Sequence, residues 1–451
     1  MVSESDLPWN FFPFPIIAQG FEILRSLLYL CNVPDESSAT KNGSHLSLAY
    51  ANSAYAFCLW IDEYGYQMGG KIRKYLEILT HHFRCAIGRV VEVSSRYTGY
   101  CVDSPAVGGG KLRVGGARLL SKGNDVTTKV FLSIDAEEDE WEAYEKGSYE
   151  VTSLNRIPML QEILERYGAI PTYFCTYEVA RNESSSAVLK EILDRGRCEI
   201  GAHCHPWNTP PIFNGIYPRD SMLCNLPNRV VFDKIKALHE LIIHRFQVVP
   251  QAFRAGRWGV GPSVAKIIKE LGYKVDTSVT PYGNWKIYQG PDFSRVGPSA
   301  YRFNPDDILC EDLRGSLVEV PVTIGFLQNN FKRCAAVRRL IMNGRLSHVH
   351  ILGLLDKLRI LNIRWLSPEL SSAREMICLT KRLLKKKCAS LNLTFHTNSL
   401  IPGKNIFVRN EEELVFFLRK IETYLEFACK NNFEFLPLSA ATEIYARGDN
   451  L

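Results

Sequence analysis

The sequence of 451 residues contains no CxxC pair, although it has thirteen cysteines. Zinc ribbons need such closely spaced pairs, and disulfide scaffolds use an even number of cysteines at regular spacings. The odd and irregular set argues against both classes and favours a reducing compartment. We therefore expect a cytoplasmic protein whose cysteines stay unpaired.

Long uncharged apolar runs are also missing. The apolar stretch near the N-terminus is broken by two prolines and by Gln19, Glu22 and Arg25, which makes it a poor membrane span. Its first residues are acidic, unlike the basic start of a secretory signal. We expect no transmembrane segment. A helix over 17–30 is expected to pack on the protein body, with peripheral membrane contact by this N-terminal helix as the alternative.

A strong charge of one sign is absent as well, since the net charge is only +6. Basic residues gather at 381–387 without interleaved aromatic residues, which is typical of a solvated helix face and not of a nucleic-acid partner. The glycine-rich stretch 107–125 lacks the spacing GxxxxGK[ST] of a phosphate loop. It predicts a linker or an irregular loop.

From residue 129 onward, short apolar runs alternate with stretches of helical periodicity, whereas residues 1–125 show no such pattern. The predicted strands are 130–134, 171–177, 198–205, 252–259, 273–279, 317–326, 391–399 and 433–439. The predicted helices are 157–167, 187–195, 231–246, 262–271, 332–387 and 411–431. This alternation indicates parallel βαβ units in a barrel or a doubly wound sheet. In both architectures the active site lies at the carboxyl ends of the strands.

The first predicted strand ends in the acidic sequence SIDAEEDEW. Residues i and i+2 of a strand point to the same side, so Asp135 and Glu137 share one face. The alternative is a helix N-terminus, where acidic side chains are favourable. That alternative accounts for residues 138–140 better than for an Asp placed directly on an apolar strand.

The strand EIGAHCH ends in a second polar pair, His203 and His205, again at i and i+2. Together with a carboxylate from a neighbouring strand, they would supply three ligands and leave an open position, as in a catalytic Zn²⁺ site. Histidines with a purely structural role are the alternative. Cys204 should point to the opposite face and act as a small buried hydrophobic residue.

Two further strand ends carry polar residues. FRAGRWG supplies Arg254 and Arg257, and an arginine beside a buried carboxylate would orient it and keep it ionised. For Arg257, a surface position is the simpler interpretation. LTFHTNS supplies His396, which could act as a general acid or base. The coincidence of all these residues with strand ends predicts a metal-assisted hydrolytic site.

These stretches resemble the five motifs of the NodB-homology polysaccharide deacetylases, also called carbohydrate esterase family four. In order, the similar stretches are SIDAEEDEW, EIGAHCHPW, FRAGRWG, YKVDTSV and LTFHTNS. The second motif is most similar to that of the WalW-like branch. The sequence departs from the family pattern in two ways. In the first motif, Ala136 stands where a second aspartate is usual. The histidines are two residues apart instead of four, with Trp207 at the later position.

The resemblance implies a distorted (β/α)7 barrel, an α/β fold, over residues 126–445. It leaves residues 1–125 as a loop-rich extension of unknown role and about 328–390 as a helical insertion that caps the substrate pocket.

The resemblance also implies roles for single residues. The catalytic residues would be Asp135 as the base, Arg254 as the residue that orients it, and His396 as the acid. The metal ligands would be Glu137, His203 and His205, with Glu138 as the alternative carboxylate. The substrate-binding residues would be Trp207, Arg257, Trp258 and Asp276. The expected cofactor is a divalent metal, Zn²⁺ in the first place, with Co²⁺ or Ni²⁺ as alternatives.

The expected reaction is removal of an acyl group, in the first place acetyl, from an amino sugar or glycan. A nucleotide-linked or lipid-linked precursor suits a cytoplasmic enzyme better than a wall polymer. Two alternatives remain open at this point. One is a catalytically inactive glycan-binding protein, and the other is a metal-dependent hydrolase of another non-peptide C–N bond or of a phosphoester.

Overall fold

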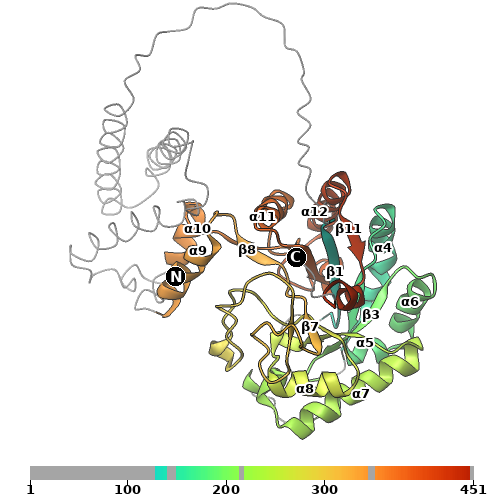
Figure 1. The fold of residues 1–451 in the computed structure, drawn as a ribbon. Helices are drawn as coiled ribbons and strands as arrows, with labels where there is room; N and C mark the ends of the chain where they lie inside the picture. Colours follow the sequence, from blue (N-terminus) through green and yellow to red (C-terminus); the bar gives the residue numbers. More distant parts are fainter. Residues whose placement is uncertain (1–126, 140–148, 213–217, 344–350, 447–451) are drawn as a thin grey trace, which may run out of the picture. The chain divides into compact units, whose positions relative to one another are not determined.

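The computed structural model describes residues 127–139, 149–212, 218–343 and 351–446 (Figure 1). The predicted N-terminal extension, residues 1–125, lies outside the described residues, together with its predicted helix and its glycine-rich stretch. Among the described residues, no helix is both long enough and apolar enough to cross a membrane.

Strands and helices alternate along the described chain. The strands are β1 (Lys129–Ala136), β2 (Thr172–Cys175), β3 (Glu199–Cys204), β4 (Ala252–Ala255), β5 (Val275–Asp276), β6 (Tyr301–Phe303), β7 (Leu317–Glu319), β8 (Ile324–Phe326), β9 (Ile363–Trp365), β10 (Ser390–His396) and β11 (Glu434–Leu436). The helices are α4 (Ile157–Arg166), α5 (Tyr177–Arg181), α6 (Glu183–Asp194), α7 (Asn228–Phe246), α8 (Pro262–Glu270), α9 (Phe331–Asn343), α10 (Ile351–Lys357), α11 (Ala373–Lys385), α12 (Glu411–Lys430) and α13 (Ala441–Ile444).

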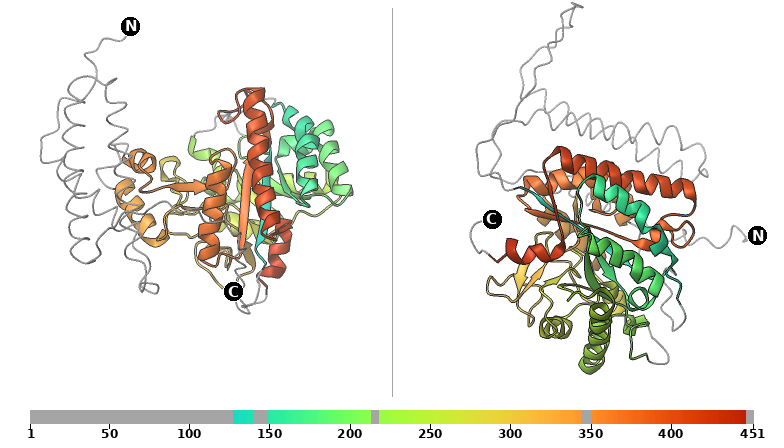
Figure 2. Two further views of the ribbon diagram at one scale, coloured as in Figure 1. Left: turned by 90° about the horizontal axis from the view of Figure 1, so that it is seen from above. Right: turned by 90° about the vertical axis from the view of Figure 1, so that its right-hand side faces the viewer.

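The main sheet has the strand order β10-β1-β2-β3-β4-β5-β7-β6. All neighbours from β10 to β7 run parallel, β6 is antiparallel to β7, and β11 pairs with the first half of β1. Helices α4, α6, α7, α8, α11 and α12 lie around the outside of this curled sheet (Figure 1 and Figure 2). The architecture is therefore a mixed α/β half-barrel.

The expected distorted (β/α)7 barrel is confirmed only in part. No strand pairing among the described residues joins β7 back to β10. Instead, the backbone N–H of Thr323 donates to the Asn392 carbonyl (3.1 Å), and the Asn392 N–H donates to the Thr323 hydroxyl (2.7 Å). Because a side chain takes the place of a backbone acceptor, the contact does not continue as a strand ladder.

The two faces of the sheet differ in composition, as the period of two along a strand requires. In β1, the residues Val130, Leu132, Ile134 and Ala136 belong to the large core that packs against the outer helices. The alternate residues face inward, and they change from apolar Phe131 through Ser133 to Asp135. The inner face therefore becomes polar toward the carboxyl ends of the strands, as the sequence predicted.

Helix ends follow local capping rules. Ser372 and Glu375 form a reciprocal capping box at the start of α11. The Asn410 side chain caps α12, whose first turn carries three glutamates that are favourable next to the positive end of the helix.

The stretch 332–387 is less helical than the sequence predicted. Residues Ile363–Trp365 form strand β9, which pairs antiparallel with β8. The single strand expected over 317–326 is divided into β7 and β8. Two features explain the error: short apolar runs fit either a buried helix or a strand, and Pro368 cannot lie inside a continuous helix.

Two glycines allow a test of packing, Gly201 in strand β3 of the sheet and Gly353 in helix α10. A Cβ added to Gly201 would lie 2.7 Å from Cε1 of the fully buried Phe174 ring. We predict that Gly201→Ala lowers the free energy of unfolding by about 1–3 kcal/mol, because the ring has no space to move. At Gly353 in α10, an added Cβ meets nothing within 4 Å.

The matched control, Gly353→Ala, should raise the free energy of unfolding by about 0.5–1 kcal/mol, because alanine favours a helix. Urea denaturation of the full chain, followed by circular dichroism, measures both effects. Equal midpoints for the two variants would contradict this account of the packing.

Candidate metal centre

Three side chains from the ends of β1 and β3, which lie on either side of β2, meet at one point. Glu137 follows β1, His203 lies in β3 and His205 follows β3 directly. One ligand atom from each lies within 4.8 Å of the other two. The Nε2 atoms of His203 and His205 are 2.9 Å apart, and they lie 3.8 and 3.4 Å from Oε2 of Glu137. The spacing of two residues thus brings both imidazoles to the same place.

The other nitrogen of each imidazole is already engaged. Nδ1 of His203 lies 3.0 Å from the backbone carbonyl of Arg254, and Nδ1 of His205 lies 3.1 Å from Oε2 of Glu138. Because both partners only accept, each Nδ1 carries a proton, and an imidazole without a second proton presents its Nε2 lone pair to the common point. An imidazole fixed in this way by a carbonyl or carboxylate is typical of a metal ligand.

The donor set fits a divalent cation. Nε2 of His203 and Nε2 of His205 lie at hydrogen-bond distance, 2.9 Å, beside the negative charge of the Glu137 carboxylate. Burial would lower the pKa of His205, but Glu138 outweighs burial and raises it, so that in the metal-free chain Nε2 of His205 can donate a proton to His203. Burial lowers the pKa of His203 to about 3, which keeps the imidazole neutral, and burial raises the pKa of Glu137 to about 7. A cation bound between these three donors would replace the proton between the two imidazoles and compensate the charge of Glu137, and two nitrogens with one carboxylate oxygen suit Zn²⁺.

Glu138, the alternative carboxylate ligand, faces elsewhere. Its oxygens accept from Nδ1 of His205 (3.1 Å) and from the Asn208 side chain (2.5 Å). Burial alone would raise the pKa of Glu138, but His205 outweighs burial and lowers it. The geometry therefore favours Glu137 as the ligand, with Glu138 holding the imidazole of His205 from behind.

Asp135 forms a buried ion pair with Arg254 beside this cluster. Arg254 Nη1 donates to Oδ1 of Asp135 at 2.5 Å, and the arginine has 0% exposure. Burial alone would raise the pKa of Asp135, but the charge of Arg254, with smaller contributions from His203 and His396, lowers it. Asp135 is therefore an ionised acceptor whose orientation is fixed by Arg254.

His396, at the end of β10, lies across from Asp135. Its Nε2 is 3.6 Å from Oδ2 of Asp135, and its Nδ1 is 3.0 Å from Oε2 of Glu369. Burial would lower the pKa of His396, but Glu369 and then Glu137 outweigh it and raise the pKa to about 10. His396 is therefore protonated near neutral pH.

Glu369 was not predicted from the sequence. It accepts hydrogen bonds from the His396 backbone, the His396 ring and the Ser399 hydroxyl. It lies in a stretch that was assigned to a helix. The signal that could have found it is Pro368, which marks the end of the helical pattern and places the glutamate in a connection.

The four residues predicted to bind substrate have different surroundings. Trp207 is buried and stacks on His205, with ring centroids 4.2 Å apart. Trp258 is half-buried over the guanidinium of Arg254, 5.3 Å from the ring centroid. Arg257 lies away from Asp135, donating to the Ser221 hydroxyl and lying over the Tyr288 ring.

Asp276 is not part of the metal cluster. Its carboxylate is 1% exposed and accepts from Ser278, and its neighbour across the strand pair is the equally buried Glu319. Burial raises the pKa of both carboxyl groups. Asp276 therefore lies beside Glu319 in the strand register, and its predicted contact with substrate stays a prediction.

The cysteines in the described part of the chain play no visible part in the site. Cys204 is fully buried in the core on the opposite face from its two histidine neighbours, as predicted. Burial raises the pKa of its thiol to about 12. The described cysteines, among them Cys204, are all unpaired, as predicted for them.

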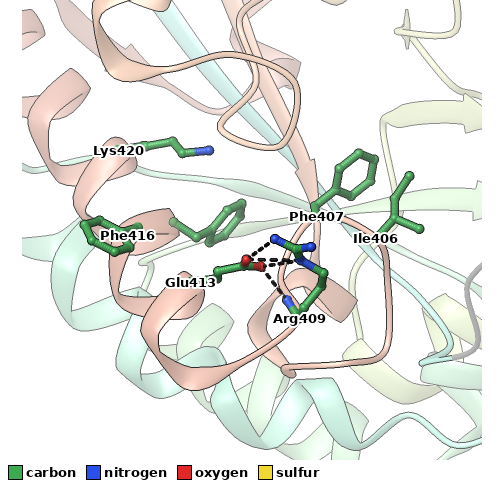
Figure 3. A pocket seen from close by; sticks show the side chains of 7 residues that line it. Ile406, Phe407, Arg409, Glu413, Phe416 and Lys420 are labelled. Atoms are coloured by element: carbon green, nitrogen blue, oxygen red, sulfur yellow. Dashed lines mark hydrogen bonds and ion pairs between the residues drawn. The ribbon is translucent and has the colours of Figure 1, made fainter. Parts of the chain in front are cut away.

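A separate hollow of about 240 Å³ lies along the start of α12 (Figure 3). It is lined by Ile406, Phe407, Arg409, Glu413, Phe416, Phe417 and Lys420. Arg409 and Glu413 neutralise each other across it. None of the three metal-ligand candidates lines this hollow, so we do not assign the substrate to it.

No family model matches the sequence, and no curated protein matches it. Similar solved structures include the Xyl-CE4 domain of a xylanase from the hindgut metagenome of Trinervitermes trinervoides, with 10% identity over 72% of this chain and 94% of that chain, at a TM-score of 0.34. A structure called T48 deacetylase with substrate has 11% identity over 71% and 94%, at 0.33. A branching enzyme from Thermococcus kodakaraensis has 10% identity over 71% of each chain, at 0.39. At such low scores, the function has to be argued from the residues of this chain.

The two adjacent glutamates make the ligand assignment testable. We predict that Glu137→Gln abolishes Zn²⁺ binding, because it removes the charged ligand. Glu138→Gln should weaken binding by about 10- to 100-fold, because the carboxylate behind His205 is lost while all three ligands stay. Zinc content after dialysis and calorimetric titration measure both. The control is His244→Ala, which removes an exposed histidine of α7. Equal loss in both glutamate variants would contradict the assignment.

The Asp276–Glu319 pair predicts a pH-dependent stability. Because burial raises both folded-state pKa values, the folded chain binds more protons than the unfolded chain once the pH rises above about 4. The contribution to the free energy of unfolding therefore decreases as the pH increases through the folded-state values. Among the described residues, Arg254 and Tyr301 also interact electrostatically with this pair.

Glu319→Gln should flatten this decrease, since the amide keeps a neutral polar group of the same shape. Urea denaturation at several pH values between about 4 and 8 measures the slope. The exposed acid variant Asp194→Asn should keep the slope of the parent chain. An unchanged slope in Glu319→Gln would show that the pair shares no excess proton.

Proposed function

We propose that this chain is a metal-dependent hydrolase that removes an acyl group from the nitrogen of an amino sugar or glycan. Acetyl is the first candidate for this acyl group. The observation that supports the proposal most is the opposition of an ionised acceptor and a protonated donor, Asp135 and His396, 3.6 Å apart beside the Glu137–His203–His205 cluster. The motif resemblance adds support for a divergent deacetylase of the WalW-like branch.

Glu137, His203 and His205 are the residues that would hold the metal. When bound there, the metal would polarise the acyl carbonyl and lower the pKa of a water molecule. Zn²⁺ is the first candidate because the donor set is two imidazoles and one carboxylate. Co²⁺ and Ni²⁺ are the alternatives to be tested.

Asp135 is the proposed base. Arg254 keeps Asp135 ionised and fixes Oδ1, which leaves Oδ2 directed toward His396. A carboxylate held in this orientation can take the proton of an attacking water without the entropic cost of orienting itself first. Arg254 itself does not reach outward, because all its donors are used within the sheet.

His396 is the proposed acid. Glu369 fixes Nδ1, so the Nε2–H faces the space beside Asp135. Expulsion of an amine from a tetrahedral centre requires protonation of the leaving nitrogen, and a histidine with its second nitrogen bonded to a carboxylate is suited to that step. The proposed base, Asp135, and the proposed acid, His396, therefore point toward the same region of space.

The substrate class is proposed from the aromatic residues near the base. Trp258 is half-buried over Arg254 and lies 6.0 Å from the half-buried Trp365 of β9. Flat aromatic faces of this kind suit the apolar face of a pyranose ring. The resemblance to glycan deacetylases points in the same direction, and a nucleotide-linked or lipid-linked amino sugar stays the proposed precursor.

The mechanism predicts separate losses of metal and turnover. Asp135→Asn should keep bound Zn²⁺ and lose at least about a hundredfold in kcat, because the base becomes neutral. The assay is amine release from N-acetylated sugars, chitin oligomers and nucleotide derivatives by the metal-loaded chain. Circular dichroism has to confirm folding, since the variant leaves Arg254 without its carboxylate.

Asp194→Asn is the matched surface control and should keep parent turnover. Full turnover by Asp135→Asn would rule out the proposed base. A parent chain that binds Zn²⁺ and cleaves p-nitrophenyl esters or phosphoesters but no N-acetyl sugar would change the substrate class and keep the metal chemistry.

A further inference from the structure

Lys234 lies in an unusual place for a lysine. It belongs to α7 and is 1% exposed, although lysine is almost never fully buried in proteins. Its neighbours along the helix, Val231, Ile235 and Leu238, are part of the hydrophobic core. Burial lowers the pKa of its ammonium group to about 8. A buried amine at a core position has to be explained by what it binds.

Lys234 binds the loop that follows the second histidine. Its Nζ donates to the backbone carbonyls of Thr209 and Pro211, each at 2.6 Å. Residues 206–211, called here the 206–211 loop, start directly after His205. Two short bonds from one ammonium group fix the path of this loop against α7.

The same loop holds the imidazole of His205 from two sides. Trp207 stacks on the ring, with centroids 4.2 Å apart and planes inclined by 25°. Asn208 donates to Glu138 at 2.5 Å, and Glu138 accepts from Nδ1 of His205 at 3.1 Å. The orientation of His205 therefore depends on where the loop places Trp207 and Asn208.

We propose that Lys234 is a positioning residue for the metal centre, acting through the 206–211 loop on His205. The inference rests on the proposed function, because it presumes that His205 is a metal ligand. Removal of the ammonium group leaves two carbonyls without a donor next to the core, so the loop has to move toward other partners. Trp207 and Asn208 move with it, and His205 loses its fixed orientation.

The test uses Lys234→Met in the full chain, which keeps the length of the side chain and removes the charge. Zn²⁺ affinity, measured by competition with a chelator, should decrease about tenfold, in the range found for outer partners of metal ligands. Lys236→Met, on the exposed part of the same helix, should bind Zn²⁺ like the parent.

A loss of stability alone has to be separated from positioning. Leu238→Ala removes a fully buried side chain of the same helix without touching the 206–211 loop bonds. It should be destabilised and still keep Zn²⁺ affinity within about twofold of the parent, because outer-partner effects on metal affinity are local. If Leu238→Ala and Lys234→Met weaken Zn²⁺ binding equally, the proposal is overturned.

A double-mutant cycle identifies the route. Asn208→Ala should weaken Zn²⁺ binding, and Lys234→Met should add little in its presence, because both act on His205 through the same loop. If the fold-losses of Zn²⁺ affinity in the two single variants multiply in the double variant, the route through the loop is contradicted.

The imidazole resonances of His205 in the metal-free chain provide a readout that needs no bound metal. They should shift in Lys234→Met and stay in place in Lys236→Met, with assignment by His205→Ala. If the parent chain binds no Zn²⁺ but these resonances shift as expected, the proposed function fails while the positioning role stands. If the resonances and the Zn²⁺ affinity both match the parent, Lys234 only ties a helix to a loop.

Discussion

The interaction on which the rest of the structure depends is the ion pair of Arg254 with Asp135. Taking a guanidinium and a carboxylate out of water costs several kcal/mol per ion, so the pair is stable only if its remaining donors are satisfied. Ser133, Thr394 and Thr277 accept them from the inner face of the sheet. Phe174 and Trp258 cover the guanidinium. These polar groups on the inner face of the half-barrel therefore replace the water that the guanidinium of Arg254 loses on burial.

This constraint connects the base to the metal centre. The backbone carbonyl of Arg254 accepts from Nδ1 of His203, while its side chain holds Asp135. One residue of β4 thus fixes the tautomer of a proposed ligand and the ionisation of the proposed base. A displacement of β4 along its neighbours would disturb both at once, which explains why the strand register and the site cannot vary independently.

Much of this arrangement could be predicted from the sequence, because strand ends are marked by apolar runs that stop at polar residues. Asp135, Glu137, His203 and His205 lie where that rule placed them. Glu369 could not be found in this way, since it comes from a connection and reaches His396 only through the fold. The pairing of Asp276 with Glu319 could not be predicted for a related reason: the pattern locates a strand end, but it does not show which side chain of the neighbouring strand lies beside a carboxylate. For the same reason the sequence could not decide between Glu137 and Glu138 as the ligand. The two residues are chemically identical, and only the structure shows that their side chains have different partners.

The spacing of the two histidines follows from where they lie on the chain. On an extended strand, residues two apart direct their side chains to the same side, so His203 and His205 meet without any turn between them. The next position on that side is Trp207, which has already left the strand and turns back to stack on His205. An aromatic ring there gives His205 a fixed wall, and Glu138 gives it a fixed acceptor. With a spacing of two residues, the proposed second ligand, His205, therefore lies next to His203 and is held in place by Trp207 and Glu138.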